Sequence, residues 1–199
     1  FRMRIFNSDG SEAMMCGNGS RCVGKFVYDK GLTEKKSVTL ETLSGIKILN
    51  LHVENGKVES VSVDMGKSQI LTLGGNTTPF VNQPITAKGI TMNGTAVSMG
   101  NPHLVFFVEN AEIFDVASVG PAFEHHPWFE NRTNVEFAQI LSPAKIRMRV
   151  WERGSGITMA CGTGACATFA AAKECGLVNG KTTLVLDGGE LQIENSSTN

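Results

Sequence analysis

Alternating apolar and polar positions predict β-strands along much of this chain. In these segments every second residue is apolar, or the apolar residues run together, as in strands with one or both faces buried. They are "SVTLETL" (37–43), "IKILNLHV" (46–53), "KVESVSVDMG" (57–66), "GTAVSMG" (94–100) and "HLVFFVEN" (103–110). Connections rich in Gly, Asn and Pro, such as "LGGNTTPFVNQP" (73–84), separate the predicted strands.

Two segments have helical character instead. "GACATFAAAKECG" (164–176) is rich in alanine, and Gly176 stands where a glycine commonly ends a helix. Earlier in the chain, Val23, Phe26 and Val27 give an apolar face before Gly31, although Gly24 disfavours a helix there. Each predicted helix follows a Cys-Gly-x-Gly sequence and precedes a predicted β-hairpin.

The two helical segments belong to an internal repeat with a constant offset. Cys16 and Cys161 lie 145 residues apart, and this offset also places "RMRIF" (2–6) on "RMRVW" (147–151) without a gap. "MMCGNGSRC" falls on "MACGTGAC", and Gly31 falls on Gly176. A register that holds over this length favours duplication of one unit over chance similarity. The repeated unit is a strand, a loop, a helix and a hairpin.

The repeat predicts an α+β fold of two pseudo-symmetric lobes. Each lobe is expected to be a mixed or antiparallel sheet wrapped around a central helix. We place the remainder of the N-terminal lobe at residues 1–57 and the C-terminal lobe at 58–199. Because a strand-rich stretch precedes only the second copy, we expect the segment that precedes the first copy to be missing from this chain.

Composition restricts the classes of function. The 199 residues are 41% hydrophobic and 19% charged, with a formal net charge of -1 and no long block of like charge. This balance favours a small-molecule ligand over nucleic acid or a membrane surface. No apolar run is long enough to span a membrane, and the start lacks a signal-peptide core, which predicts a cytoplasmic protein. Five cysteines without CxxC pairs predict reduced thiols and no metal site.

The paired cysteines carry the strongest chemical signal. A cysteine in the first turn of a helix faces free N–H groups and the positive end of the dipole, both of which favour the thiolate. One such motif would also fit a phosphate loop or a simple helix start. Two of them could place a base and an acid on opposite faces of one carbon, while the helix termini stabilise charge on an attached carboxylate. The pattern predicts stereoinversion by Cys16 and Cys161, and leaves the other cysteines as small core residues.

At these residues the sequence resembles the diaminopimelate epimerase family. The resemblance rests on four segments, "NSDGSEAMMCGNGSRC", "MGNPH", "TNVEF" and "ERGSGITMACGTGACA". It implies an isomerase that interconverts LL- and meso-diaminopimelate for lysine and peptidoglycan-precursor synthesis, without pyridoxal phosphate or any other cofactor. A homodimer is a further expectation from the family. Members of the family carry additional segments at both ends, so the resemblance also implies truncation.

The resemblance assigns roles to individual residues. Cys16 and Cys161 match the acid/base pair, and His103 and Glu152 match residues thought to tune the two thiols. The remaining matches are substrate contacts: Gly17, Asn18, Gly162 and Thr163 at the helix termini, and Asn7, Asn101, Asn134, Glu152 and Arg153 elsewhere. Among the latter, Arg153 suits the distal carboxylate and Glu152 the distal ammonium.

Two alternatives remain at this point. A proline or hydroxyproline racemase would also use two cysteines, but Asn18 stands where those enzymes commonly have His, and Glu152 with Arg153 suits a substrate with a second charged end. A catalytically inactive binding remnant would explain the missing ends.

Overall fold

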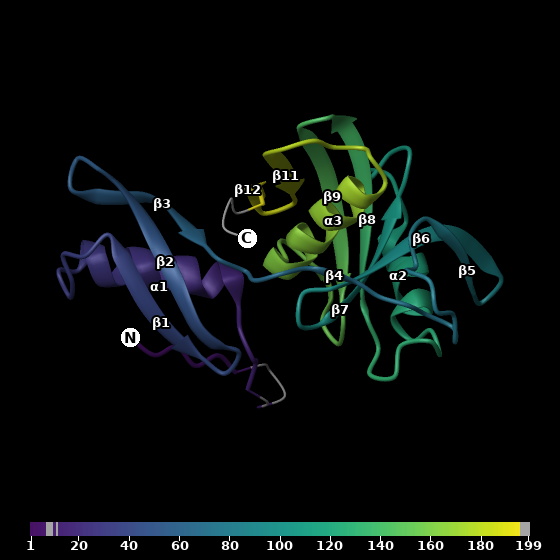
Figure 1. The fold of residues 1–199 in the computed structure, drawn as a ribbon, viewed down its shortest axis with the longest axis horizontal. Coiled ribbons are helices and arrows are strands. Elements are labelled where there is room, and N and C mark those ends of the chain that lie inside the picture. Colours follow the sequence, from purple (N-terminus) through teal and green to yellow (C-terminus); the bar gives the residue numbers. More distant parts are fainter. Residues whose placement is uncertain (7–9, 11, 196–199) are drawn as a thin grey trace. The chain divides into compact units, whose positions relative to one another are not determined.

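The computed structural model describes residues 1–6, 10 and 12–195, and the chain divides into two compact units between Gly66 and Lys67 (Figure 1). The division lies later than the expected boundary at residues 57 and 58. The reason is β3 (Lys57–Val63), which pairs with the preceding strand β2 (Gly45–Glu54) and so belongs to the first unit.

The first unit packs one helix on an antiparallel sheet. Helix α1 (Gly17–Asp29) lies against β2 and β3, which pair with β1 (Ser37–Thr42) in the order β1-β2-β3. The core of this unit consists of side chains at alternate strand positions and one from the helix: Val27, Val38, Leu40, Leu49, Leu51 and Val58. The alternation seen in the sequence therefore marks the buried face of the sheet.

Gly24, which disfavoured the first predicted helix, has a packing role in it. A Cβ at this position would lie 3.0 Å from Leu51 Cδ2 and 3.2 Å from Leu49 Cδ1. The glycine lets the helix approach β2 closely, and its cost in helix propensity is offset by tertiary packing.

The second unit contains a nine-stranded mixed sheet. Its main path runs in the order β12-β11-β9-β8-β7-β6-β4, with β10 beside β9 and β5 beside β6. The pairs β7·β8 and β9·β11 are parallel. The strands are β4 (Gln69–Ile70), β5 (Gln83–Ala87), β6 (Ile90–Ser98), β7 (Pro102–Phe107), β8 (Asn134–Ser142), β9 (Lys145–Glu152), β10 (Gly156–Thr158), β11 (Thr182–Leu186) and β12 (Gly189–Ile193).

Two helices complete this unit. Helix α3 (Gly162–Glu174) contacts β6, β7, β8, β9, β11 and β12, and nine consecutive residues from Gly164 to Ala172 are buried. Most of these buried residues have small side chains, which lets the helix pack closely on the sheet, and Phe169 is the one large side chain among them. Helix α2 (Val116–Glu124) packs elsewhere on the sheet, where Phe123 contacts Phe106 in an aromatic cluster.

The structure confirms the α+β fold and repeats the offset of the sequence. Helices α1 and α3 begin and end 145 residues apart, and both have 13 residues. Both end at a glycine of positive φ, Gly31 at +70° and Gly176 at +69°. The next residue then donates back into each helix, from Leu32 N to Val27 O at 2.9 Å and from Leu177 N to Ala172 O at 2.8 Å. The same capping motif in both copies is what duplication of one unit predicts.

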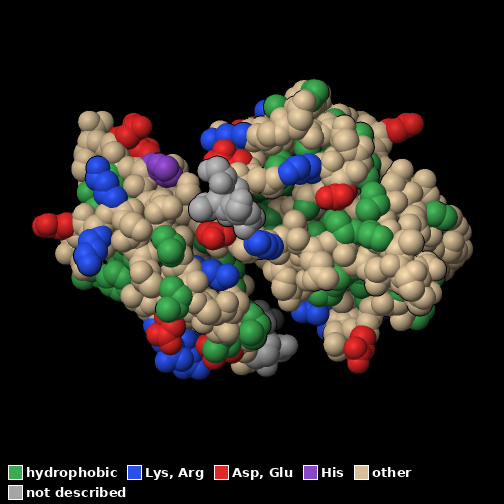
Figure 2. All heavy atoms as spheres, viewed as in Figure 1, with side chains coloured by type: hydrophobic (Ala, Val, Ile, Leu, Met, Phe, Trp, Pro, Cys, Tyr) green, Lys and Arg blue, Asp and Glu red, His purple; other side chains and the backbone are tan. Residues whose placement is uncertain are grey.

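Charged side chains of both signs are interspersed on the face shown in Figure 2, in keeping with the formal net charge of -1. Within the described part of the chain, none of the helices has the length and apolar character needed to cross a membrane.

Candidate active site

Cys16 is the N-cap residue of α1. Its backbone is extended, with φ -133° and ψ 114°, and its Sγ accepts a hydrogen bond from the N–H of Gly19 at 3.3 Å. Cysteine thus takes the place that Ser, Thr or Asp usually occupies at a helix start. The sulfur is thereby held at the positive end of the helix dipole, as the sequence predicts.

Cys161 caps α3 in nearly the same geometry. Its φ and ψ are -124° and 113°, and its Sγ accepts from the N–H of Gly164 at 3.3 Å. The Thr163 hydroxyl lies 3.5 Å from the same sulfur. Unlike Cys16, which is half-buried, Cys161 is only 7% exposed. The two copies therefore share a capping geometry but differ in solvation.

Burial raises the pKa of the Cys161 thiol, and the charge of the nearby Glu152 carboxylate raises it further. The hydrogen bonds from Thr163 and Gly164 act in the opposite direction but are outweighed. The sequence suggests that a helix N-terminus favours the thiolate, yet at this sulfur the loss of hydration is the larger effect. Burial at this position therefore favours the thiol form of Cys161 over the thiolate.

The end of β9 presents Glu152 and Arg153. Glu152 Oε1 accepts a hydrogen bond from the Thr158 hydroxyl, which fixes the carboxylate. Arg153 is held at its backbone, where its N–H donates to Asn134 Oδ1 at 3.0 Å, and at its side chain, where Nη1 donates to the Asn131 carbonyl at 3.0 Å. These contacts leave further guanidinium N–H groups for a ligand.

Asn134 is 5% exposed, and the oxygen and nitrogen of its side-chain amide both form hydrogen bonds with backbone groups. Besides accepting from Arg153, it donates from Nδ2 to the Pro102 carbonyl at 3.0 Å. The side chain thereby ties the start of β7 to the turn after β9. The structure thus gives Asn134 a role in shaping the site, and its second Nδ2 hydrogen is the one left for a substrate.

His103 on β7 lies at the centre of a buried polar chain. Its Nδ1 is 2.6 Å from Glu136 Oε1, and its Nε2 is 3.1 Å from Asn101 Oδ1. Asn101 in turn donates from Nδ2 to the Thr163 hydroxyl at 3.5 Å, and Thr163 contacts Cys161. The chain connects a buried glutamate on β8 to the sulfur at the start of α3.

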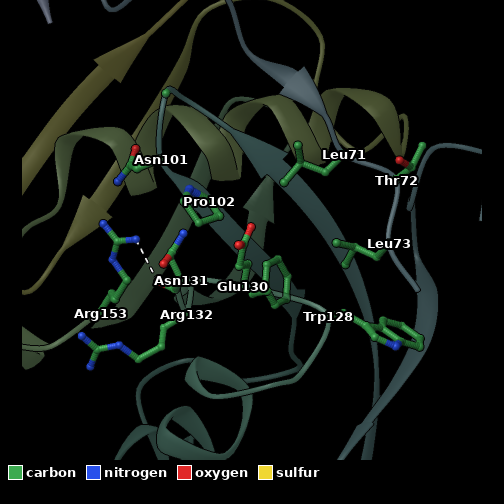
Figure 3. Close-up of a pocket in the computed structure, with 12 residues that line it drawn as sticks. Leu71, Thr72, Leu73, Asn101, Pro102, Trp128, Glu130, Asn131, Arg132 and Arg153 are labelled. Atoms are coloured by element: carbon green, nitrogen blue, oxygen red, sulfur yellow. Dashed lines mark hydrogen bonds between the residues drawn. The ribbon is translucent and has the colours of Figure 1, made fainter. Parts of the chain in front are cut away.

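A cavity of about 460 Å³ opens beside this chain of hydrogen bonds in the second unit (Figure 3). Asn101 and Arg153 lie at one end, and Leu71, Leu73 and Trp128 lie at the other. The polar end of the cavity lies next to the residues already described, so it suits a ligand with charged groups or with groups that hydrogen-bond to an amide.

The chain is similar to known proteins over most of its length. A model of the family described as "Diaminopimelate epimerase" matches residues 1–71 and 95–199. The diaminopimelate epimerase of Phocaeicola vulgatus is 57% identical over 199 residues, which cover 97% of this chain and 70% of that protein. The diaminopimelate epimerase of Moorella thermoacetica is 52% identical over 197 residues, with 97% and 71% covered. The chain belongs to the diaminopimelate epimerase family.

Two solved structures have a fold similar to that of this chain. A probable proline racemase from Agrobacterium radiobacter K84 superimposes with a TM-score of 0.69 at 20% sequence identity, covering 96% of this chain and 62% of the racemase. A PhzF-family phenazine biosynthesis protein of Bacillus anthracis gives a TM-score of 0.69 at 16% identity, covering 96% of this chain and 70% of that one. At such identities the likeness concerns the fold alone. The chain spans less than two thirds of the racemase.

In this diaminopimelate epimerase family member, the second unit brings most of the expected site residues together. Asn101, His103, Thr163 and Cys161 share one hydrogen-bonded chain, and Gly162 begins α3 beside them. At the start of α1 in the first unit, Gly17 packs against Met65, and Asn18 Oδ1 accepts from Arg21 Nη2 at 2.5 Å. Asn7 lies outside the described residues.

Sequence reasoning missed Glu136. The signal was present, since "TNVEF" places an acidic residue in the middle of an otherwise apolar strand. The structure shows this carboxyl group fully buried against His103. Among the described residues, no group of three or more His, Cys, Asp or Glu side chains is arranged to hold a metal ion.

Proposed function

We propose that this protein is a diaminopimelate epimerase that interconverts LL- and meso-diaminopimelate without a cofactor. The observation that carries the proposal is the pair of cysteines, Cys16 and Cys161, each capping an equivalent helix with the same backbone geometry in a member of this family. We also propose a cytoplasmic location and a homodimer. Light scattering on the purified protein would test the homodimer.

The proposed reaction is a proton exchange at the α-carbon. In the direction in which Cys161 is the acid, the Cys16 thiolate removes the α-proton and becomes a thiol. The electron pair moves into the carboxylate to form an enediolate, and the Cys161 thiol protonates the opposite face. Cys161 is then the thiolate, and the reverse reaction exchanges the two roles.

Helix N-termini supply the electrostatic stabilisation. In an α-helix the first N–H groups have no intrahelical acceptor, and they favour the negative charge that the reacting carboxylate gains. Gly17 with Asn18, and Gly162 with Thr163, are the residues that offer these groups here. The high pKa of Cys161 also makes its thiolate a strong base once it has given up its proton.

The distal end of the substrate is the part that distinguishes diaminopimelate from simpler amino acids. Arg153 has N–H groups left for a carboxylate, and Glu152 is fixed for an ammonium. We assign Asn101, at the polar end of the cavity, to the same substrate. Asn7 is part of this proposal too.

The test is turnover of diaminopimelate in deuterated water. Conversion of the LL to the meso isomer with deuterium at the inverted carbon supports the proposal, and Cys16→Ala or Cys161→Ala should each abolish it. Cys22→Ala is the matched control: the sequence pattern wrongly predicts a core residue here, but Cys22 is exposed on α1, so its loss should leave turnover unchanged. Proline is the control substrate.

Failure to convert diaminopimelate while inverting proline would favour a proline-type racemase instead. Binding of diaminopimelate without any deuterium incorporation would point to an inactive binding protein.

A further inference from the structure

Glu136 is a buried acid that the proposed mechanism does not use. Its side chain is 0% exposed, and one of its oxygens, Oε2, has no hydrogen-bond partner among the described residues. A side-chain carbon at Gly164 would lie 2.7 Å from the other oxygen, Oε1, so the carboxyl group sits against the first turn of α3. The Gly164 N–H does not serve it, because that group donates to Cys161 Sγ.

The hydrogen bonds around His103 define where protons lie. The Asn101 amide donates to Thr163, so its oxygen accepts from His103 Nε2, which must carry a proton. One proton is then left between His103 Nδ1 and Glu136 Oε1, which are 2.6 Å apart.

The unpartnered oxygen decides which atom holds that proton. An ionised carboxylate with one oxygen buried and unbonded is far more costly than a neutral acid whose carbonyl oxygen is unbonded. Burial raises the pKa of Glu136, and the Glu152 charge adds to this, while His103 acts against it. The proton therefore stays on Glu136.

With Glu136 neutral, every hydrogen bond points the same way. Glu136 donates to His103, His103 to Asn101, Asn101 to Thr163, and the Thr163 hydroxyl is free to donate to Cys161 Sγ. A neutral Glu136 also spares the Cys161 thiolate the repulsion of a second anion.

We propose that Glu136 is a positioning residue for the epimerisation, a neutral acid that holds His103 in its Nε2–H tautomer and so directs a hydrogen-bond chain onto the sulfur of Cys161. The inference rests on the proposed function, but its first test does not require turnover.

The first test is the tautomer of His103, measured by ¹⁵N NMR of the imidazole, with the signal assigned through His103→Gln. We expect a proton on Nε2 and an unprotonated Nδ1 at neutral pH. A proton on Nδ1, alone or together with one on Nε2, would overturn the proposal because Glu136 would then be an acceptor. An inactive wild type that shows the Nε2–H form would refute only the proposed function.

The second test compares two variants of similar length. In Glu136→Gln the amide can still donate to His103 Nδ1, so we expect the tautomer and kcat to be kept within about 3-fold. Glu136→Met has no donor, so the tautomer should be lost and kcat should fall roughly 10-fold or more with little change in KM.

Circular dichroism establishes that each variant folds. A Gln variant as impaired as Met, or a folded Met variant with full kcat, contradicts the proposal. Should Met fail to fold, the Gln variant and the wild-type NMR spectrum still decide.

Discussion

At the residue scale, Cys161 shows how position in the fold can override a local rule. A helix N-terminus lowers thiol pKa values when the sulfur is also solvated or near cations. At Cys161 the sulfur is buried and the Glu152 carboxylate lies nearby, so the pKa of the thiol rises. The helix start is visible in the local sequence pattern, whereas the effect of Glu152, at the end of β9, enters only through the family resemblance.

This difference predicts slow alkylation of Cys161. Because only the thiolate reacts, each unit by which the pKa rises lowers the reaction rate about 10-fold at a fixed neutral pH. We therefore expect iodoacetamide to label Cys161 at least about 10-fold more slowly than exposed Cys22 at pH 7.5. Peptide mass spectrometry measures both rates in one sample, and denatured protein gives the control in which they should converge. Equal labelling of the two in folded protein would be inconsistent with this account.

The charge of Glu152 can be tested in the same assay. Its carboxylate raises the pKa of Cys161, so Glu152→Gln should lower that pKa and speed labelling of Cys161 severalfold at pH 8. Glu190→Gln is the matched control, since it removes an equal charge from an exposed ion pair with Lys145. A rate that responds equally to both substitutions would mean that net charge, and not the charge at β9, is what matters.

The same pKa has a consequence for stability. A thiol whose pKa is higher in the folded than in the unfolded state stabilises the fold fully below the unfolded value of about 8.5. This contribution is lost as pH rises above that value towards the folded pKa. Cys161→Ala should therefore flatten the loss of unfolding free energy between about pH 8 and 10, as measured by urea titration.

At the element scale, the caps were the most predictable parts. Gly31 and Gly176 were expected to end their helices, and both do so with positive φ. The strands of the first hairpin, β1 and β2, also lie where the alternating pattern places them. The local pattern at Gly24 disfavours a helix, because the role of this glycine depends on the close approach of β2, a tertiary contact that a local pattern does not reveal. For the same reason Glu136 looked like a single polar residue in a strand.

The equivalence of the two caps makes a further prediction. A Cβ in this left-handed conformation costs about 1 to 2 kcal/mol. Gly31→Ala and Gly176→Ala should each lower the unfolding free energy by that amount, and Gly176→Asn by less, since Asn tolerates the conformation. Urea unfolding followed by circular dichroism provides the measurement. Unchanged midpoints in both alanine variants would show that the repeated cap does not contribute to stability.

At the scale of the whole molecule, the repeat was predicted from the sequence but the extent of the second sheet was not. The offset of 145 residues predicts two similar units, each with a helix and a hairpin. The order of the nine strands, with two parallel pairs, depends on contacts between segments far apart in the chain. Such pairings leave no local pattern, because a strand buried on both faces looks the same beside any neighbour.

The proposed reaction uses both copies of the motif, so the two cysteines should be needed for the same step. Each inversion needs one thiol to take a proton and the other to give one, so losing either removes the same step. Cys16→Ala and Cys161→Ala should each lower kcat by at least about 10³-fold, and the double variant should be no worse than either single one. Steady-state kinetics with diaminopimelate, with Cys22→Ala added to each background as a control, measures this coupling. If the two losses multiplied in the double variant, the cysteines would contribute independently. A shared step in one reaction would then no longer explain why the motif occurs twice.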